Sequence, residues 1–91
     1  MQVECRFFGP FRDDVGERTH VHETDADSYG DLLRELEAEF PVLEGRLVDG
    51  EAVAGQAAIT KNGTNIRHRG GLTTAVEEGD VVRMTPSVYG G

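Results

Sequence analysis

Hydrophobic and polar residues alternate from Gln2 to Phe8, with the apolar positions at Val3, Cys5 and Phe7. This period of two is typical of a strand with one buried face. We therefore predict that Cys5 points into the core and acts as a small apolar side chain, not as a reactive thiol. Glycine and proline interrupt the next stretch, residues 8–16, which we expect to be a loop.

A second alternation runs from Arg18 to Thr24 around Val21 and predicts a strand that forms a hairpin with the first. In this register His20 and His22 share the outward face. Two histidines at this spacing suit a metal ion, but no third ligand lies close in the sequence. We therefore expect a solvent-facing pair and no metal site.

The middle of the chain shows the helical period instead. Ser28 with Asp31 resembles an N-terminal capping arrangement, and Pro41 ends the pattern. A short second helix is predicted from Pro41 to Leu47, followed by a loop over residues 49–55. The apolar positions of the main helix form one stripe, which must be buried against a sheet: Tyr29, Leu32, Leu33, Leu36 and Phe40.

Strand patterns return after residue 56. Ala57–Lys61 has the pattern of a short strand, and Asn62-Gly63 is the strongest two-residue hairpin signal in the chain, leading into residues 64–66. Lys61 is thereby predicted at a hairpin tip. Val81–Thr85 follows a tight turn, and its β-branched residues predict a central last strand.

This order of elements predicts an α+β fold, with a mixed sheet of four to five strands over one main helix. The last strand can pair in parallel with the first, because the helix between them provides a long crossover. We assign residues 1–85 to one domain and residues 86–91 to a flexible C-terminal tail.

The composition is acidic, with 17 acidic against 9 basic residues and a net charge of -8. This balance argues against a nucleic-acid partner and favours a self-repelling monomer. Eight of the basic residues are arginine and only Lys61 is lysine, which resembles proteins of halophilic archaea. No apolar run approaches the roughly 18 residues of a membrane span, no secretion signal is recognisable, and one cysteine cannot form an internal disulfide. We expect a cytoplasmic protein.

The last two residues, Gly90-Gly91, are the most informative candidate site. Glycine has no Cβ, so two in succession give a thin strip of backbone that fits a narrow channel. A partner enzyme can convert the terminal carboxylate to an acyl adenylate, which a sulfur or amine nucleophile then attacks. Pro86 favours an extended exit from the domain. The alternative is a small, frayed terminus without a function of its own.

Two segments resemble the ubiquitin-like sulfur-carrier family of β-grasp proteins, which includes the small subunit of molybdopterin synthase, the thiamine sulfur carrier and the small archaeal modifier proteins. Phe8–Gly16 is similar to the family's first hairpin. Gly71–Val82, Pro86 and Gly90-Gly91 follow the family's glycine, leucine, acidic turn, strand, proline and diglycine in register. Two residues depart from the pattern, since Ser87 replaces a common second proline and Tyr89 precedes the glycines where small residues are frequent.

The resemblance implies that the chain is a substrate and not an enzyme. Gly91 would carry the activated carboxylate, and Gly90 would let it reach the ATP site of an adenylating enzyme similar to ubiquitin's. ATP and magnesium would belong to that partner, and the chain would need no cofactor. The resemblance further implies that four residues form the arm threaded into the partner: Pro86, Ser87, Val88 and Tyr89.

Three functions compete. The first is a protein modifier joined to substrate lysines by an isopeptide bond and also able to carry sulfur as a thiocarboxylate. The second is a dedicated sulfur carrier for molybdenum cofactor synthesis or tRNA thiolation, with the molybdopterin synthase large subunit as a partner. The third is a non-covalent β-grasp binding module. If modifier chains form, Lys61 is the candidate acceptor, and otherwise it is a solvated charge at the hairpin tip.

Overall fold

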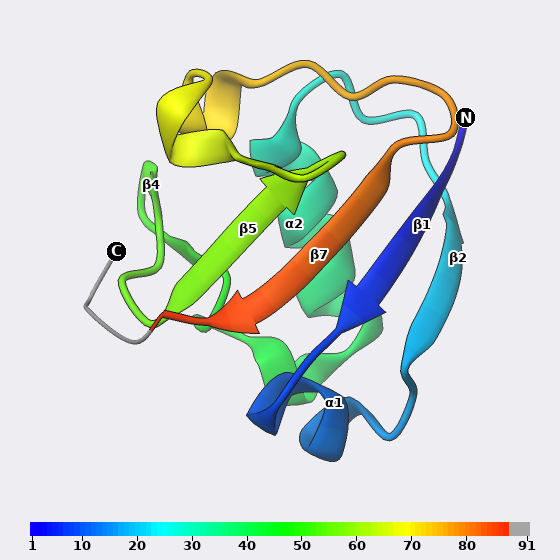
Figure 1. Ribbon diagram of the computed structural model, residues 1–91, viewed down its shortest axis with the longest axis vertical. Coiled ribbons are helices and arrows are strands. Elements are labelled where there is room, and N and C mark those ends of the chain that lie inside the picture. Colours follow the sequence, from blue (N-terminus) through cyan, green and yellow to red (C-terminus); the bar gives the residue numbers. More distant parts are fainter. Residues whose placement is uncertain (88–91) are drawn as a thin grey trace.

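The computed structural model describes residues 1–87 and shows a five-stranded mixed sheet with a long helix packed on one face (Figure 1). The strand order is β2-β1-β7-β5-β6, and a separate two-stranded ribbon joins β3 to β4. The elements are β1 (Gln2–Phe7), α1 (Pro10–Val15), β2 (Thr19–Glu23), α2 (Tyr29–Glu39), η1 (Pro41–Leu43), β3 (Val48–Asp49), β4 (Ala52–Val53), β5 (Ala57–Lys61), β6 (Thr64–Asn65), η2 (Ile66–His68), η3 (Gly71–Thr73) and β7 (Val81–Pro86).

The central strand is β7, which pairs in parallel with β1 and antiparallel with β5. The strand β2 extends the sheet antiparallel to β1. This is the β-grasp arrangement, in which the first and last strands of the chain lie side by side and the helix covers their inner face. The predicted α+β fold is confirmed.

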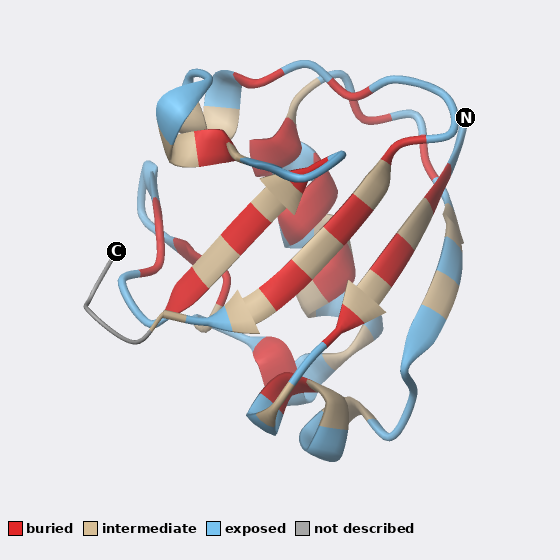
Figure 2. Cartoon of the chain, viewed as in Figure 1, coloured by how far each residue is buried: buried red, intermediate tan, exposed pale blue. Residues whose placement is uncertain are grey.

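The core lies between α2 and the inner face of the sheet. Buried and half-exposed positions alternate along β1, β7 and β5, as the period-two pattern requires (Figure 2). Cys5 is fully buried, as predicted. The other core side chains of these three strands and of α2 are Val3, Phe7, Ala57, Ile59, Val82, Met84, Tyr29, Leu32, Leu33 and Leu36.

The main helix begins and ends where the sequence predicts. Ser28 has an extended backbone, and its Oγ accepts a hydrogen bond from the Asp31 backbone N–H at 3.3 Å. This satisfies one of the N–H groups that have no partner inside the helix. Pro41 follows the helix directly and begins the short turn η1, which ends at Leu43 and is therefore shorter than the predicted second helix.

The prediction of a loop over residues 8–16 is wrong, because this segment contains α1. Pro10 occupies the first helical position, where the missing N–H has no partner to lose and the fixed φ suits a helix. Phe11 is buried under this turn, and Gly16 ends it in the left-handed conformation at φ 86°. Burial of the Phe11 side chain thus stabilises a helical turn that the glycine and proline residues of this segment did not predict.

The prediction that His20 and His22 face outward is also wrong. Directly paired residues of antiparallel strands share a face, and His20 pairs with the buried Cys5. The His22 Nε2 atom lies 2.9 Å from a carboxylate oxygen of Glu35 on α2, while Val21 is the residue that is 59% exposed. Among residues 1–87 no group of three or more His, Cys, Asp or Glu side chains is placed to hold a metal ion.

The remaining turns follow the sequence with one exception. Asn62 and Gly63 have φ values of 49° and 93°, so both central residues of the β5–β6 hairpin are left-handed, as a type I′ turn requires. The expected loop over residues 49–55 instead includes part of the β3–β4 ribbon, in which Val48 pairs with Val53. None of the helices within residues 1–87 has the length and apolar character to cross a bilayer.

Leu36→Ala is expected to lower the free energy of unfolding by about 2–5 kcal/mol, because it removes a fully buried side chain and leaves a cavity between α2 and the sheet. Urea denaturation monitored by circular dichroism measures this change. Val21→Ala is the matched control, with an expected change within about 0.5 kcal/mol at an exposed site. Equal effects of the two substitutions would contradict the core described above.

Stability is expected to fall at alkaline pH. Burial, followed by the charge of Glu4, raises the pKa of the Cys5 thiol from 9.0 to about 12. Because folding favours the protonated thiol, its contribution is complete below pH 9 and is lost as the pH rises toward 12. Between about pH 8 and about pH 10.5, wild type should lose about 1–2 kcal/mol more than Cys5→Ala. Urea unfolding of both proteins at the two pH values tests this, and parallel losses would disprove it.

Candidate functional site

The candidate site begins at the end of β7, the last strand in the part of the chain that the structure describes. Pro86 lies opposite Ala57 in β5, and the Ser87 backbone N–H donates to the Gln56 carbonyl at 2.8 Å. The first two residues of the predicted arm are therefore paired with the sheet, and β7 is one residue longer than expected. Residues 88–91, which include Val88, Tyr89, Gly90 and Gly91, lie outside the described part of the chain, and their roles stay predictions.

Pro86 also ends the parallel pairing with β1. The Phe8 N–H donates to the Met84 carbonyl at 3.0 Å, and the next N–H that would face β1 belongs to position 86, where proline has none. Gly9 lies beside this proline, with φ +57° and no side chain. A Cβ at Gly9 would stand 3.3 Å from Pro86 Cγ, so glycine permits the close approach of the two segments.

Positive charge gathers beside the end of β7. A shallow pocket is lined by Arg6, Arg12 and Arg18 around Phe8, which is 38% exposed. Arg83 of β7 stands next to Arg6 in the parallel register. Arg6 forms an ion pair with Glu4 on the same strand. In a chain with a net charge of -8, this arginine group is a local exception.

The arginine group was not predicted from the sequence. The three pocket arginines are six residues apart along the chain, which matches neither the helical period nor the strand period. They come together because the turn α1 reverses the chain between β1 and β2. The one available signal was Pro10 at a position suited to start a helix.

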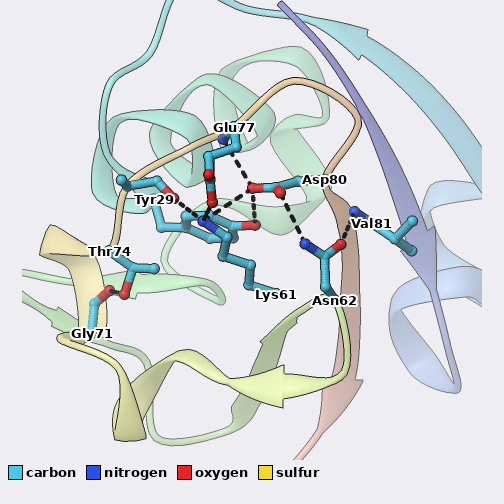
Figure 3. A network of polar contacts seen from close by, with 9 residues as sticks. Tyr29, Lys61, Asn62, Gly71, Thr74, Glu77, Asp80 and Val81 are labelled. Atoms are coloured by element: carbon cyan, nitrogen blue, oxygen red, sulfur yellow. Dashed lines mark hydrogen bonds and ion pairs between the residues drawn. The ribbon is translucent and has the colours of Figure 1, made fainter.

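The position of Lys61 at a hairpin is confirmed, but the expectation of a solvated side chain is wrong. Its Nζ donates to the Ala75 carbonyl at 2.7 Å and to the Glu77 carboxylate, and lies 3.6 Å from Asp80 Oδ2 (Figure 3). Only 5% of the side chain is exposed. The alternation along β5 already contained this signal, because Lys61 follows Ala57 and Ile59 on the inward face.

Asp80 is the centre of this polar group. The whole residue is 2% exposed, and its carboxylate accepts hydrogen bonds from the Tyr29 hydroxyl, the Asn62 side-chain amide and the Glu77 backbone N–H, each at 3.0 Å (Figure 3). Burial, and then the hydrogen bond to Asp80, raise the pKa of Tyr29 far above its usual range, so the phenol remains a donor. The buried charge of Asp80 is thus both paired and hydrogen-bonded, as the low dielectric of an interior requires.

Neither of the candidate reactive side chains among residues 1–87 is free at the surface. Within residues 1–87 the candidate nucleophile Cys5 is buried and protonated, and Lys61 is held by carboxylates. What the site offers is the end of β7 beside a cationic surface that includes the exposed Phe8. Such a charged and partly apolar face suits contact with another protein.

The comparisons with known proteins point in the same direction. The model of the ThiS family matches residues 5–91. Small archaeal modifier protein 3 of Haloferax volcanii is 41% identical over 92 residues, which cover the whole of both chains. A Haloferax volcanii protein solved in solution is 41% identical, has a TM-score of 0.87, and is matched over 100% of this chain and 87% of that one. Sulfur carrier protein CysO of Mycobacterium bovis is 34% identical over 68 residues, 71% of this chain and 73% of that protein.

The resemblance identified from the sequence is confirmed by these matches. Relatives named as protein modifiers and as sulfur carriers both align with the chain, so it is a small ubiquitin-like protein of one or both kinds. With a β-grasp sheet and a family match over residues 5–91, the chain belongs to the ThiS family.

Proposed function

We propose that this chain is a protein modifier whose Gly91 carboxylate is adenylated by an activating enzyme and then joined to substrate lysines. The observation that carries the proposal is the diglycine end, which follows Pro86, the last residue of the central strand β7, by four and five positions in the sequence. The likeness of this chain, over its full length, to a small archaeal modifier protein supports the same function.

The geometry at the end of β7 suits this chemistry. Ser87, the last residue that the structure describes, is paired with the sheet, and four residues follow it in the sequence. A fully extended chain of that length spans about 13–14 Å. This reach brings the terminal carboxylate to an ATP site set below a partner's surface, while the folded domain remains outside.

The reaction needs nothing from this chain except its carboxylate. Attack of the carboxylate on the α-phosphorus of ATP forms the acyl adenylate and releases pyrophosphate. A substrate lysine amine then attacks the acyl carbon, AMP leaves, and the nitrogen gives up a proton. ATP and magnesium belong to the adenylating enzyme, and the chain itself is a substrate and not a catalyst.

Sulfur transfer is the second candidate, and the likeness to a sulfur carrier protein supports it. Here a sulfur nucleophile displaces AMP and leaves a thiocarboxylate at Gly91. The recipient would be molybdopterin, in the large subunit of molybdopterin synthase, or a tRNA. Both functions use the same adenylate, so one chain can serve both.

The sheet face around the end of β7 is the proposed contact surface for the adenylating enzyme. Phe8 offers an apolar contact there, and Arg83 with the pocket arginines offers positive charge. An acidic surface on the enzyme would complement this face, whereas the rest of the acidic chain would be repelled. The high net charge also favours a monomer, and the single reduced cysteine suits the cytoplasm.

Removing Gly90 and Gly91 should abolish both conjugation and thiocarboxylate formation. Tagged protein is isolated from its host under denaturing, reducing conditions and digested with trypsin, which cuts after Arg83. A modifier leaves residues 84–91 as a branch on lysines of other proteins, and a sulfur carrier leaves the free peptide heavier by the difference between sulfur and oxygen. An unmodified terminus with the activating enzyme present would favour the non-covalent binding module.

Arg83→Glu should lower kcat/KM for adenylation about tenfold at low salt, because it reverses a charge on the proposed contact surface. ATP–pyrophosphate exchange with the activating enzyme measures this. Arg69→Glu is the matched control, since it makes the same charge change in an exposed turn after η2. Equal losses for the two variants would show that net charge, and not this face, matters.

A further inference from the structure

We infer that this chain is a single-copy modifier, which is attached to other proteins through Gly91 but forms no isopeptide-linked chains with itself. The inference rests on the proposed function and adds that the modifier does not itself accept another copy through an isopeptide bond. An isopeptide-linked chain requires a lysine on the modifier to accept the next copy. Lys61 is the one lysine among 91 residues, so the question reduces to the state of its amine.

The amine of Lys61 is enclosed and fully engaged. The three N–H donors of an ammonium group have three acceptors close by: the Ala75 carbonyl, the Glu77 carboxylate and the Asp80 carboxylate. The Nζ also lies 5.9 Å from the centre of the Tyr29 ring, which closes another side. With 5% of the side chain exposed, an incoming acyl group meets these residues first.

The surroundings of Lys61 disfavour its acylation both when the amine attacks and after the amide has formed. Attack on the acyl carbon needs a neutral amine with a free lone pair, but two carboxylates hold the Lys61 ammonium in place. The amide product has lost the positive charge, so the Asp80 carboxylate, itself 3% exposed at the side chain, would remain in the interior without its cation. An uncompensated buried charge strongly destabilises a fold. Acylation of Lys61 therefore requires the local structure to open.

The other cationic side chains are arginines, whose guanidinium groups remain protonated and are not acyl acceptors. The positive charge near the end of β7 thus comes from arginines, and no lysine contributes to it. The Met1 α-amine donates to the Thr24 carbonyl at 2.8 Å, and acylation there would form a peptide bond and not an isopeptide bond. The consequence for function is that no lysine-linked chain grows from a modified substrate lysine. Further isopeptide-linked copies on a protein must occupy further lysines of that protein.

Amine acetylation of the full-length chain tests the state of Lys61 without any activating enzyme. In the variant Arg69→Lys, the introduced amine stands in an exposed turn and serves as the control within the same molecule. Under native conditions Lys61 should react more than about tenfold more slowly than this amine, and in urea the two should react alike. Peptide mapping by mass spectrometry reads both rates. Similar rates in the folded protein would overturn the inference.

Conjugation with the activating enzyme and ATP tests the consequence. Wild type should give tryptic branches of residues 84–91 on other proteins and none on Lys61, whereas Arg69→Lys should also branch at the introduced lysine. A branch on Lys61 of the wild type would disprove the inference. Absence of every conjugate, including those of Arg69→Lys, would instead reject the proposed function, and the acetylation rates would still decide whether Lys61 is accessible.

Discussion

The parallel pairing of β1 with β7 is the interaction on which the rest of the structure depends. It joins the first strand to the last, from Glu4 opposite Val81 to Phe7 opposite Met84. Parallel neighbours need a long crossover, and α2 supplies it while covering the apolar inner face of both strands. Because the pairing ends where β1 turns into α1, Pro86 lies beside that turn, close to Gly9.

A second constraint holds the opposite end of the sheet. Lys61 and Asn62 at the β5–β6 hairpin contact Asp80 just before β7, so the loop that leads into the central strand is fastened to the hairpin by charge and hydrogen bonds. Such a polar group is tolerated in an interior only when its members are satisfied. It fixes the start of β7, while the β1 pairing and the Ser87 bond to Gln56 fix its end. Contacts thus hold both ends of β7, the strand that precedes the tail in the sequence.

In this protein, the groups that stabilise the fold differ from the group that reacts in the proposed function. The described residues form one folded unit whose buried ionisable groups stabilise the fold, and the proposed reaction uses only the terminal carboxylate. Arginine and acidic residues form the charged surface, and the single lysine is withdrawn from it. In the proposed reaction, such a chain offers its partners the terminal carboxylate and no accessible lysine.

Local patterns in the sequence were sufficient for the strands β1, β2, β5 and β7, the capped helix at Ser28 and the Asn62-Gly63 turn, because each depends on residues close together in the chain. They were insufficient where distant residues decide the outcome. Phe11 stabilises α1 by burial against the core, His20 faces inward because it pairs with Cys5, and Lys61 is buried because Asp80 and Glu77 meet it from another loop. Short segments are ambiguous alone, and only tertiary contacts determine which side of them is buried.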